Sequence, residues 1–414
     1  MQHRLVAAER LVGAERYSRV RLLAVARQAA CTAQRALLSD ILSIFLATRL
    51  AFLLLTYFGR ALIHDPALVG QGRIGFSGYL LDAWFYRDSQ WYLAIVQHGY
   101  HYFGRGHVSA VAFFPVYPLL VAVLQAASGM DVGIAAMIVS NLSFLGALIY
   151  LHRLCEREFG PGVARRAVFY LAIFPTAFFT FAAYSESLFL LLSISCCYYL
   201  RGERWWPAAI LGGLAAATRI LGVLLVLAFI WEYLRAHRFD PRRFRPDLLA
   251  GALIPGGIGL YMVYLYGLTG DPTAFVKAEA GWNRVATWPW QVLRTSLQDV
   301  PLSGSEGAYF QAHAYIEVGL VIACLLLILA GIRRLPISFV LYGMASLGVL
   351  MSAPVLSSRI PMTSMSRYVL VLFPVTMVLA LLGRWAIFDR LYVLLSTGGL
   401  AIFTMLFLNH MWGA

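Results

Sequence analysis

Residues 132–152 read VGIAAMIVSNLSFLGALIYLH and contain no Asp, Glu, Lys or Arg. A helix needs about 20 consecutive apolar residues to cross the hydrocarbon core of a bilayer, so this stretch predicts a transmembrane helix. Similar apolar blocks fall at about 41–62, 166–182, 184–200, 207–234, 248–268, 315–332, 336–354, 368–384 and 390–409. They predict an all-α polytopic membrane protein with about 9–11 transmembrane helices. A transmembrane β-barrel is disfavoured, because its strands are short and alternate in hydropathy.

The composition supports the same class. Of the 414 residues, 60% are hydrophobic and only 13% are charged, whereas soluble domains carry about 25% charged residues. The formal net charge of +13 comes from arginine, since Lys277 is the only lysine. Most arginines lie within residues 1–40 or in short loops, a pattern typical of cytoplasmic topology signals. We therefore expect membrane lipids as partners, and no nucleic acid.

The orientation is predicted from arginine-rich loops, which fall at 153–166, 201–206, 235–247, 333–335 and 384–390. If these loops are cytoplasmic, the external loops are 63–131, 269–314 and 355–367. Residues 1–40 carry seven arginines and are predicted to be a basic cytoplasmic segment attracted to anionic lipid. A disordered tail or an over-extended translation start is the alternative. The transmembrane domain is then 41–409, followed by a short tail at 410–414.

Two segments do not fit a simple series of spans. The run 112–128 begins with two prolines, Pro115 and Pro118, and is predicted to be an external juxtamembrane or re-entrant helix. The run 207–234 begins and ends beside cytoplasmic loops, so it is predicted to be a hairpin of two short helices or one dipping element. A turn at Thr218-Arg219 would keep the guanidinium away from lipid, where it would cost about 2.5–3.5 kcal/mol.

The first external loop contains the most informative polar stretch. Residues 91–96 are predicted to form an amphipathic helix on the membrane, ended by Gly99. Asp88 and Ser89 stand where a helix N-cap belongs. Asp88 is thus either a cap or a carboxylate held at the membrane face for chemistry. The hairpin between 166–182 and 184–200 places residues 184–187 at the external surface.

Metal and disulfide chemistry receive little support. The five cysteines have neither framework nor metal-ligand spacing. The histidines of the first loop lie three and six residues apart in a turn-rich segment, without the usual companion ligands; they are His98, His101 and His107. We expect no metal site, although the sequence does not exclude a divalent cation.

Six short motifs resemble, in order, the GPI mannosyltransferase II (PIG-V-like) family. They are DSQWYLAIVQHGY at 88–100, AFFPVYPL at 112–119, AYSESLF at 183–189, ATRILG at 217–222, GDPTAF at 270–275 with Trp282, and SMSRY at 364–368. The resemblance covers roughly 45–385. One departure is visible, because the family tends to have Arg-Trp-Asp where this chain has Tyr86-Arg87-Asp88.

The resemblance implies a fold and a reaction. It implies a GT-C-like bundle with external juxtamembrane helices in the first loop, and inverting transfer of a sugar from a polyprenyl-phosphate donor. The family's acidic residue of the first external loop carries over to Asp88 as general base, with Asp82 as the weaker alternative. The leaving phosphate needs cations but no protein acid. No cofactor is therefore required.

Further residues are assigned expected roles on the same basis. The candidates for binding the donor phosphate are Arg219 and Arg367, followed by Arg284 and Arg87. The candidates for positioning acceptor or sugar are Glu186, Trp91, Tyr92 and Tyr184. Alternatives remain open: Arg367 could anchor a helix at the interface, Arg219 could pair with Glu186 for structural reasons, and the aromatic residues could form an interfacial belt.

The function expected from these features is transfer of a sugar, most simply mannose, to a hydroxyl of a lipid or envelope-glycan acceptor on the external face. A transporter or flippase of a lipid-linked sugar is the alternative, since transporters also use broken helices with charges at mid-membrane. The preference for Arg over Lys indicates a GC-rich bacterial genome, so a bacterial plasma membrane is the expected location.

Overall fold

The computed structural model describes residues 37–62, 80–298, 304–355 and 360–411. Within these ranges the regular structure is helical, and the only β pairing is an isolated bridge between Arg284 and Val355. The predicted all-α class is confirmed. The described residues divide into two units between Ala47 and Thr48. The first contributes the start of the helix Leu37–Leu62, and the second contains every contact described below. Most of the predicted segment 1–40 lies outside the described residues.

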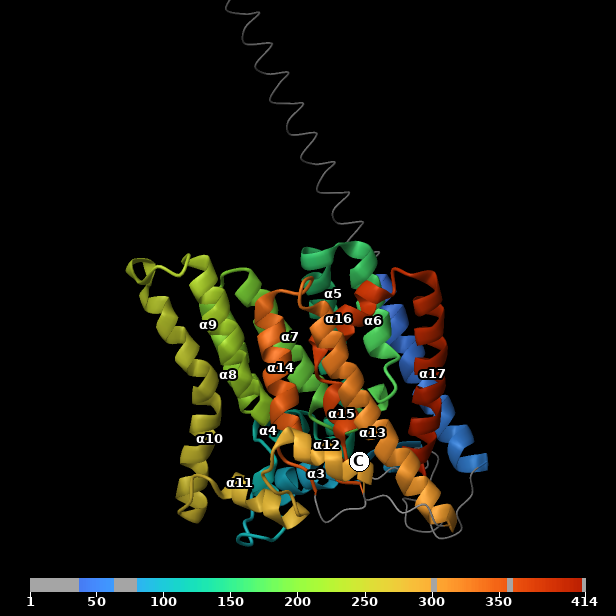
Figure 1. Cartoon of the computed structure of the whole chain (residues 1–414). Helices are drawn as coiled ribbons and strands as arrows, with labels where there is room; N and C mark the ends of the chain where they lie inside the picture. Colours follow the sequence, from blue (N-terminus) through green and yellow to red (C-terminus); the bar gives the residue numbers. More distant parts are fainter. Residues whose placement is uncertain (1–36, 63–79, 299–303, 356–359, 412–414) are drawn as a thin grey trace, which may run out of the picture. The chain divides into compact units, whose positions relative to one another are not determined.

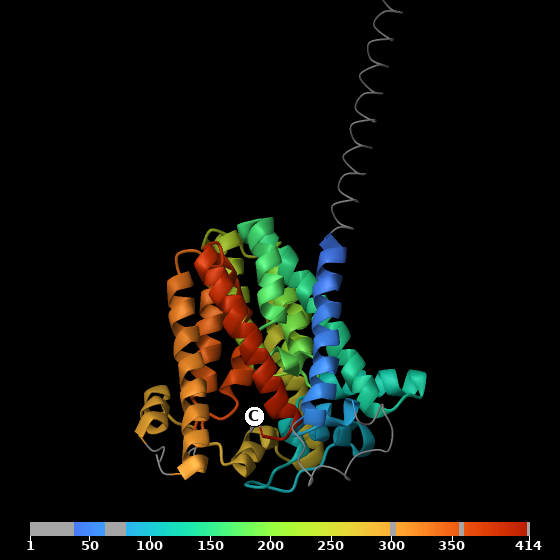
Figure 2. The same cartoon turned by 90° about the vertical axis from the view of Figure 1, so that its right-hand side faces the viewer.

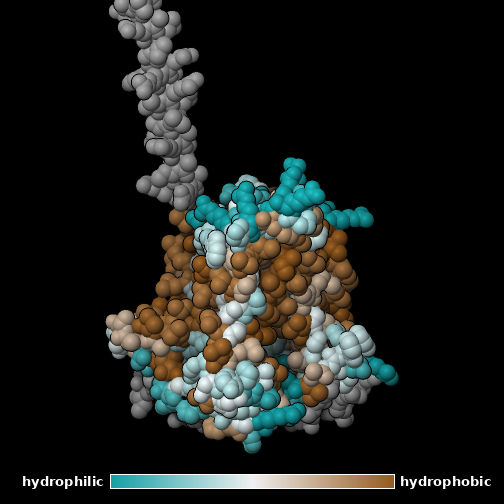
Figure 3. All heavy atoms as spheres, turned by 90° about the vertical axis from the view of Figure 1, so that its left-hand side faces the viewer, coloured by the Kyte–Doolittle hydropathy of each residue, from teal (hydrophilic) through white to brown (hydrophobic). Residues whose placement is uncertain are grey.

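Five of the described helices are long and apolar enough to cross a membrane: Leu37–Leu62, α5 (Val132–Phe159), Pro246–Thr269 (which contains α10, Leu253–Thr269), the Phe310–Gly331 part of α13 (Gly304–Gly331), and α17 (Ala386–Leu408). On α10, the side chains of Leu253, Leu260 and Val263 are exposed. Figure 3 shows a face on which hydrophobic residues form a broad band between hydrophilic margins. These features fit a chain that is embedded in lipid.

The remaining apolar blocks form shorter helices, several of them interrupted. They are α6 (Pro161–Ala172) with η4 (Ala177–Thr180), α7 (Glu186–Arg201), α8 (Trp205–Ala216) with η5 (Ile220–Leu224) and α9 (Leu225–Ala236), α14 (Ile337–Met351), and α15 (Met365–Val369) with α16 (Phe373–Leu382). The predicted hairpin at 207–234 is confirmed, because the ring of Trp205 at the start of α8 lies 4.9 Å from that of Tyr233 near the end of α9.

Three predicted loop boundaries were wrong. The arginine-rich loop 153–166 is mostly helical, since α5 continues to Phe159 and α6 starts at Pro161. Charged Glu and Arg are good helix formers, and the break comes only at Gly160, whose φ of 88° favours glycine. Similarly, α13 begins within the predicted loop 269–314 at Gly304, and α15 begins within 355–367 at Met365. Hydropathy identifies the apolar part of a helix, but the helix can continue beyond that part.

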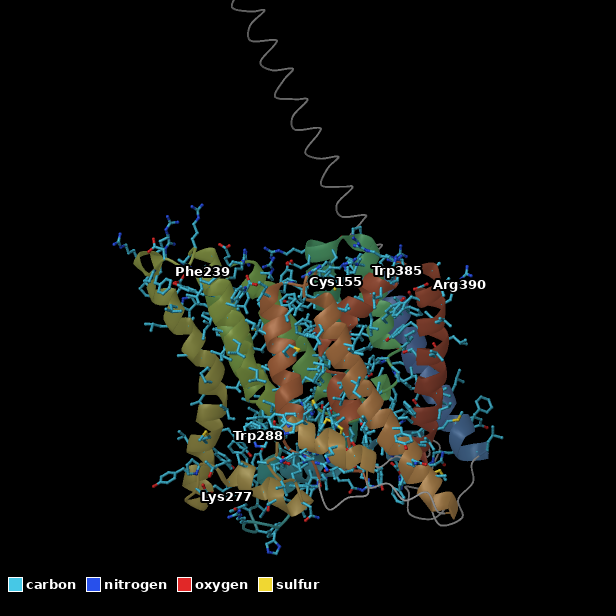
Figure 4. All side chains as sticks on the ribbon, viewed as in Figure 1. Cys155, Phe239, Lys277, Trp288, Trp385 and Arg390 are labelled. Carbon is cyan, nitrogen blue, oxygen red and sulfur yellow. The ribbon has the colours of Figure 1, made fainter. Side chains whose placement is uncertain are left out.

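The polar connections lie at opposite ends of the 48–414 unit. Figures 1 and 2 show α3 (Asp88–His98), α11 (Ala274–Glu279) and α12 (Pro289–Gln298) at one end, which we call the loop end. Figure 4 labels Lys277 and Trp288 there, and places Cys155, Phe239 and Arg390 at the other end. Arginine-rich segments that are far apart in sequence therefore share one end, as the topology argument predicted.

At the loop end, the two long connections pack on each other. Val111 of η3 (Ala110–Ala112) belongs to a buried apolar cluster with Phe275 and Ala278 of α11. The Tyr261 hydroxyl of α10 donates a hydrogen bond to the carbonyl of Val111 (2.8 Å). Gly281 approaches so closely that a Cβ there would lie 2.4 Å from the Val108 nitrogen. These contacts hold the two connections together beside α3 and α4 (Val116–Ser128).

Helices α8 and α10 approach each other through glycine. A Cβ built on Gly257 would lie 1.9 Å from the carbonyl oxygen of Gly213, whereas a Cβ on Gly256 would meet nothing within 4 Å. Close backbone approach through small residues is a common way for helices to associate in membranes. Helix α10 is thus held against α8 at this crossing.

We predict that Gly257→Ala lowers the melting temperature of the detergent-solubilised protein, because the added methyl overpacks the crossing at a cost of about 1–3 kcal/mol. Gly256→Ala is the matched control. It should leave the melting temperature unchanged or raise it, since alanine is about 1 kcal/mol better than glycine inside a helix. Equal melting temperatures for the two variants would show that the crossing is not tight.

Candidate active site

Arg367 lies at the centre of the polar cluster near the loop end. Its side chain is 4% exposed, and its Nη1 group donates a hydrogen bond to Oδ2 of Asp88 at 2.5 Å. Its Nε group donates to Oε1 of Glu186. The three residues come from α15, α3 and α7, and Asp88 and Arg367 are 279 positions apart in the chain. The fold therefore brings two predicted acidic residues and one predicted arginine into direct contact.

Glu186 joins a second arginine to this group. Its buried Oε1 also accepts a hydrogen bond from Nη1 of Arg219 at 2.8 Å, and the same Nη1 lies 3.2 Å from the Ser185 hydroxyl. The Ser185 hydroxyl in turn lies 2.7 Å from the hydroxyl of Tyr92. The second oxygen of Glu186, Oε2, is buried without a hydrogen-bond partner among the described residues. The predicted pairing of Arg219 with Glu186 is present.

The expected surface position of residues 184–187 was wrong. Tyr184, Ser185, Glu186 and Ser187 are all fully buried. The Tyr184 hydroxyl donates to the backbone carbonyl of Tyr86 (2.9 Å), which precedes α3. Helices α3 and α15 cover the start of α7. Residues 184–187 therefore line the buried side of the polar site. The sequence indicates that these residues lie between two apolar segments, but it does not indicate that they are buried.

Helix breaks supply the charged side chains. Glu186 is the first residue of α7, where the partial positive charge of a helix N-terminus favours a carboxylate. Arg219 is in extended conformation between α8 and η5. Arg367 lies in the five-residue helix α15, which follows Ser364 with a φ of 73°. Each charge thus comes from an interruption in an apolar block, where neighbouring protein rather than lipid surrounds it.

Tyr368 gathers three arginines around one ring. The guanidinium carbons of Arg219, Arg367 and Arg284 lie 5.4, 5.5 and 5.6 Å from its centroid, within cation–π range. Nη2 of Arg284 also donates to the Tyr368 hydroxyl at 3.0 Å. The aromatic face therefore holds three like charges close together, and Arg284 joins the cluster from the other long connection.

The arginines differ in how many of their donors are free. Arg367 donates hydrogen bonds from Nε and Nη1 to two carboxylates and is almost fully buried. Arg219 uses only Nη1 among the described residues, and its side chain is 12% exposed. Arg284 is 15% exposed and donates to Tyr368 and to the Ala353 carbonyl. The remaining donors of Arg219 are the ones open to an anion.

Asp88 is the first residue of α3, and its side chain does not cap that helix. The N-cap position belongs to Arg87, which has a φ of 59° and no side-chain cap. The carboxylate points to Arg367 instead and is 27% exposed. Its Oδ1 receives no hydrogen bond from the described residues. Of the two roles left open for Asp88, the structural cap is wrong, and Gly99 ends α3 as predicted.

Two candidates lie outside the cluster. Asp82, in η2 (Asp82–Trp84), lines a separate cavity of about 300 Å³ that also includes Gln97 and Asp131. Arg87 is exposed, with its guanidinium carbon 4.9 Å from the centroid of the Tyr86 ring. In the described part of the chain, neither forms a hydrogen bond or ion pair with Asp88, Glu186 or Arg367. Among the described residues, the aromatic contact of Arg87 is with Tyr86, away from the Arg367 cluster.

The aromatic candidates surround α3. The Trp91 ring stacks on Phe113 at 5.7 Å and meets Trp282 edge-on at 5.8 Å. Tyr92 is buried and so cannot form part of an exposed interfacial belt. Trp91 is partly exposed, on the same helix as Asp88. It therefore remains a candidate for contact with a sugar.

The sequence assigns no role to two residues of the site. Tyr368 lies within the motif at 364–368, and Glu279 lies in a polar connection outside any motif. Glu279 pairs with Arg284 (Oε2 to Nε, 3.3 Å). An acidic side chain thus lies next to Arg284 at the edge of the cluster.

Candidate metal ligands do not cluster in the described ranges. No group of three or more His, Cys, Asp or Glu side chains there could hold a metal ion. His98, His101 and His107 are exposed. The cysteines that the structure describes are buried and free; they are Cys155, Cys196, Cys197 and Cys324.

Comparison with known families gives a match over the part of the chain that carries Asp88, Glu186 and Arg219. Residues 34–239 match the family model described as "Mannosyltransferase (PIG-V)". This part of the chain, just under half of its length, therefore resembles the PIG-V mannosyltransferase family. The predicted relationship is confirmed, and the match includes the stretches around α3, α7 and the break after α8.

Curated relatives match over a similar part. The chain is 33% identical to mouse GPI alpha-1,6-mannosyltransferase 2 over 153 residues, which is 34% of this chain and 30% of that protein. It is 27% identical to the human protein of the same name over 208 residues, 45% of this chain and 41% of that protein. The matched region therefore spans less than half the length of these relatives.

Solved structures show more distant likeness. ArnT from Cupriavidus metallidurans, bound to undecaprenyl phosphate, aligns with a TM-score of 0.48 and 12% identity over 80% of this chain and 75% of that chain. The oligosaccharyltransferase of Archaeoglobus fulgidus aligns with a TM-score of 0.42 and 14% identity over 88% and 53%. Both scores are below 0.5.

We predict that Arg367→Met destabilises the protein more than Arg219→Met. Loss of Arg367 leaves Asp88 without its ion-pair partner and removes one of the two arginines on Glu186, at a cost of about 3–5 kcal/mol for a broken buried pair. Loss of Arg219 leaves Glu186 paired with Arg367. Thermal unfolding in detergent measures both. Similar losses for the two variants would contradict the central role of Arg367.

Proposed function

We propose that this protein transfers mannose, with inversion, from a polyprenyl-phosphate-linked donor to a hydroxyl of a lipid or envelope-glycan acceptor. The observation that carries the proposal is the pairing of Asp88 with Arg367 beside Arg219, which has unused donors, and beside the partly exposed Arg284. The family match supports the sugar, since the family description is a mannosyltransferase. We further propose that the loop end faces outward, because arginine-rich loops at the opposite end are typical of the cytoplasmic side.

Asp88 is the proposed general base. One of its oxygens is held by Arg367, so the carboxylate has a fixed direction, and the other is open to an incoming hydroxyl. The base takes the hydroxyl proton while the acceptor oxygen forms a bond to the anomeric carbon. The bond between that carbon and the phosphate oxygen breaks at the same time. The phosphate leaves as an anion, so no protein acid is needed.

Arg219 is the proposed principal ligand of the donor phosphate, with Arg284 beside it. Both are partly exposed and lie at one aromatic ring, and Arg219 has unused donors. Arg367 is less suited to this role, because its contacts with Asp88 and Glu186 already neutralise its charge. Guanidinium groups that are fixed before the reaction can stabilise charge that develops on the leaving phosphate. The proposed role of Arg367 is instead to hold the Asp88 carboxylate in a fixed direction.

We expect Asp88→Asn to reduce the rate of transfer by about 10²–10⁴-fold, the usual contribution of a general base. The amide can still accept a hydrogen bond from Arg367 but removes one of the two negative charges beside it, so a lower melting temperature is expected and turnover is measured well below unfolding. The assay uses detergent-solubilised protein with polyprenyl-phosphate mannose and a panel of hydroxyl acceptors. Transfer in detergent needs no sealed membrane, so it also separates an enzyme from a transporter.

Asp82→Asn is the matched control for this experiment. It makes the same substitution in the same connection but outside the cluster, so turnover should be unchanged. Wild-type turnover in the Asp88→Asn variant would show that Asp88 is not the general base. A loss in Asp82→Asn alone would instead select the weaker candidate.

A second expectation concerns the donor. Arg219→Met should raise the KM for polyprenyl-phosphate mannose by about 10- to 100-fold, because a hydrogen bond to a charged group contributes about 1.5–3 kcal/mol. The KM for the acceptor should change little. Arg105→Met is the control, since Arg105 is an exposed arginine of the first loop. An unchanged donor KM in Arg219→Met would remove Arg219 from the phosphate site.

A further inference from the structure

Glu317 is a fully buried carboxylate on α13, within the apolar stretch Phe310–Gly331. Ionisable residues are costly in such segments and usually have partners and a role. Oε2 of Glu317 accepts a hydrogen bond from the backbone nitrogen of Ser366 at 2.5 Å, and Oε1 accepts one from the Ser366 hydroxyl at 2.7 Å. Nε2 of His313, one turn earlier, lies 3.2 Å from Oε1.

The backbone N–H group, the carbonyl and the hydroxyl of Ser366 all form hydrogen bonds. Its N–H group belongs to the first turn of α15, where no acceptor exists within the helix, and Glu317 supplies one from another helix. Its carbonyl accepts a hydrogen bond from the hydroxyl of Thr176 at 2.8 Å. Glu317 and Thr176 are both buried. Two separate elements therefore fix the position of this one residue.

Ser366 immediately precedes Arg367, which holds Asp88. The entry to α15 passes through Ser364, whose φ of 73° is uncommon for a residue other than glycine. A helix of only five residues has little stability of its own. The position of the Arg367 backbone must therefore come from its surroundings, and the bidentate contact between Glu317 and Ser366 is a polar restraint on the adjacent residue, together with the Thr176 hydrogen bond.

We propose that Glu317 is a positioning residue for the transfer reaction. It touches neither substrate nor base, and it acts through Ser366 and Arg367 on the direction of the Asp88 carboxylate. The inference rests on the proposed function for its kinetic consequence. Its structural consequence, an α15 held in place by Glu317, does not depend on that function.

The first test is kinetic. Glu317→Ala should lower kcat by about 10²-fold, the cost of misplacing a catalytic group by about 1 Å, and leave the donor KM unchanged. Glu317→Gln should restore most of kcat, because its amide can accept from the Ser366 N–H and donate to the hydroxyl. Failure of the glutamine variant to restore activity, or a change confined to KM, would overturn the inference.

The matched control is Val321→Ala. Val321 is buried one turn further along α13, so its truncation lowers the melting temperature by removing packing. A purely structural role for Glu317 predicts that both alanine variants lose melting temperature and keep kcat, measured well below unfolding. The positioning role predicts that only Glu317→Ala loses kcat.

The second test needs no turnover. Hydrogen exchange of the detergent-solubilised protein should show lost protection of residues 365–369 and of 88–92 in Glu317→Ala, but not in Glu317→Gln or Val321→Ala. If Glu317→Ala fails to fold, Ser366→Ala removes one of the two hydrogen bonds and should give a smaller loss in the same segments. Unchanged protection of 365–369 would refute the inference.

The two tests together separate the hypotheses. An inactive wild-type protein with the expected exchange pattern would count against the proposed function and support the role of Glu317. An active wild type whose Glu317→Ala variant keeps both kcat and protection would leave the function intact and refute the positioning role.

Discussion

The ion pairs of Arg367 with Asp88 and Glu186 are the interaction on which the polar site depends. A guanidinium buried in an apolar bundle is stable only where carboxylates compensate its charge and satisfy its donors. Here the two carboxylates come from α3 and α7. The demand of one buried charge therefore fixes the relative positions of three helices. It also fixes the direction of the carboxylate proposed as base.

The same demand explains why helices are broken near the site. An uninterrupted apolar helix would carry its charges into lipid, whereas a break turns backbone and side chain towards protein. The α8–η5–α9 hairpin presents Arg219, and the short α15 presents Arg367. Tyr368 then allows Arg219, Arg284 and Arg367 to lie around one ring. The polar site is thus a product of interruptions in the apolar pattern.

Hydropathy predicted the helical class, and the positions of the arginine-rich loops predicted the hairpin at 207–234 and the separate helix within 112–128. It failed where composition does not decide an end. Helix α5 runs through Arg153 and Arg157 until Gly160 stops it. Residues 184–187 looked like a surface turn but are buried, because α3 and α15 cover them. Neither covering helix can be inferred from the residues that it covers.

The sequence by itself determined an arginine-rich membrane protein of helices, and its motifs indicated the family and named Asp88, Glu186, Arg219 and Arg367. Only the tertiary structure decided how these residues are used. It placed Arg367 between two carboxylates, left donors of Arg219 open, separated Asp82 and Arg87 from the cluster, and added Glu279, Tyr368 and Glu317. The physical reason is that the role of a charge depends on which partners neutralise it. Those partners lie up to 279 positions away in the chain.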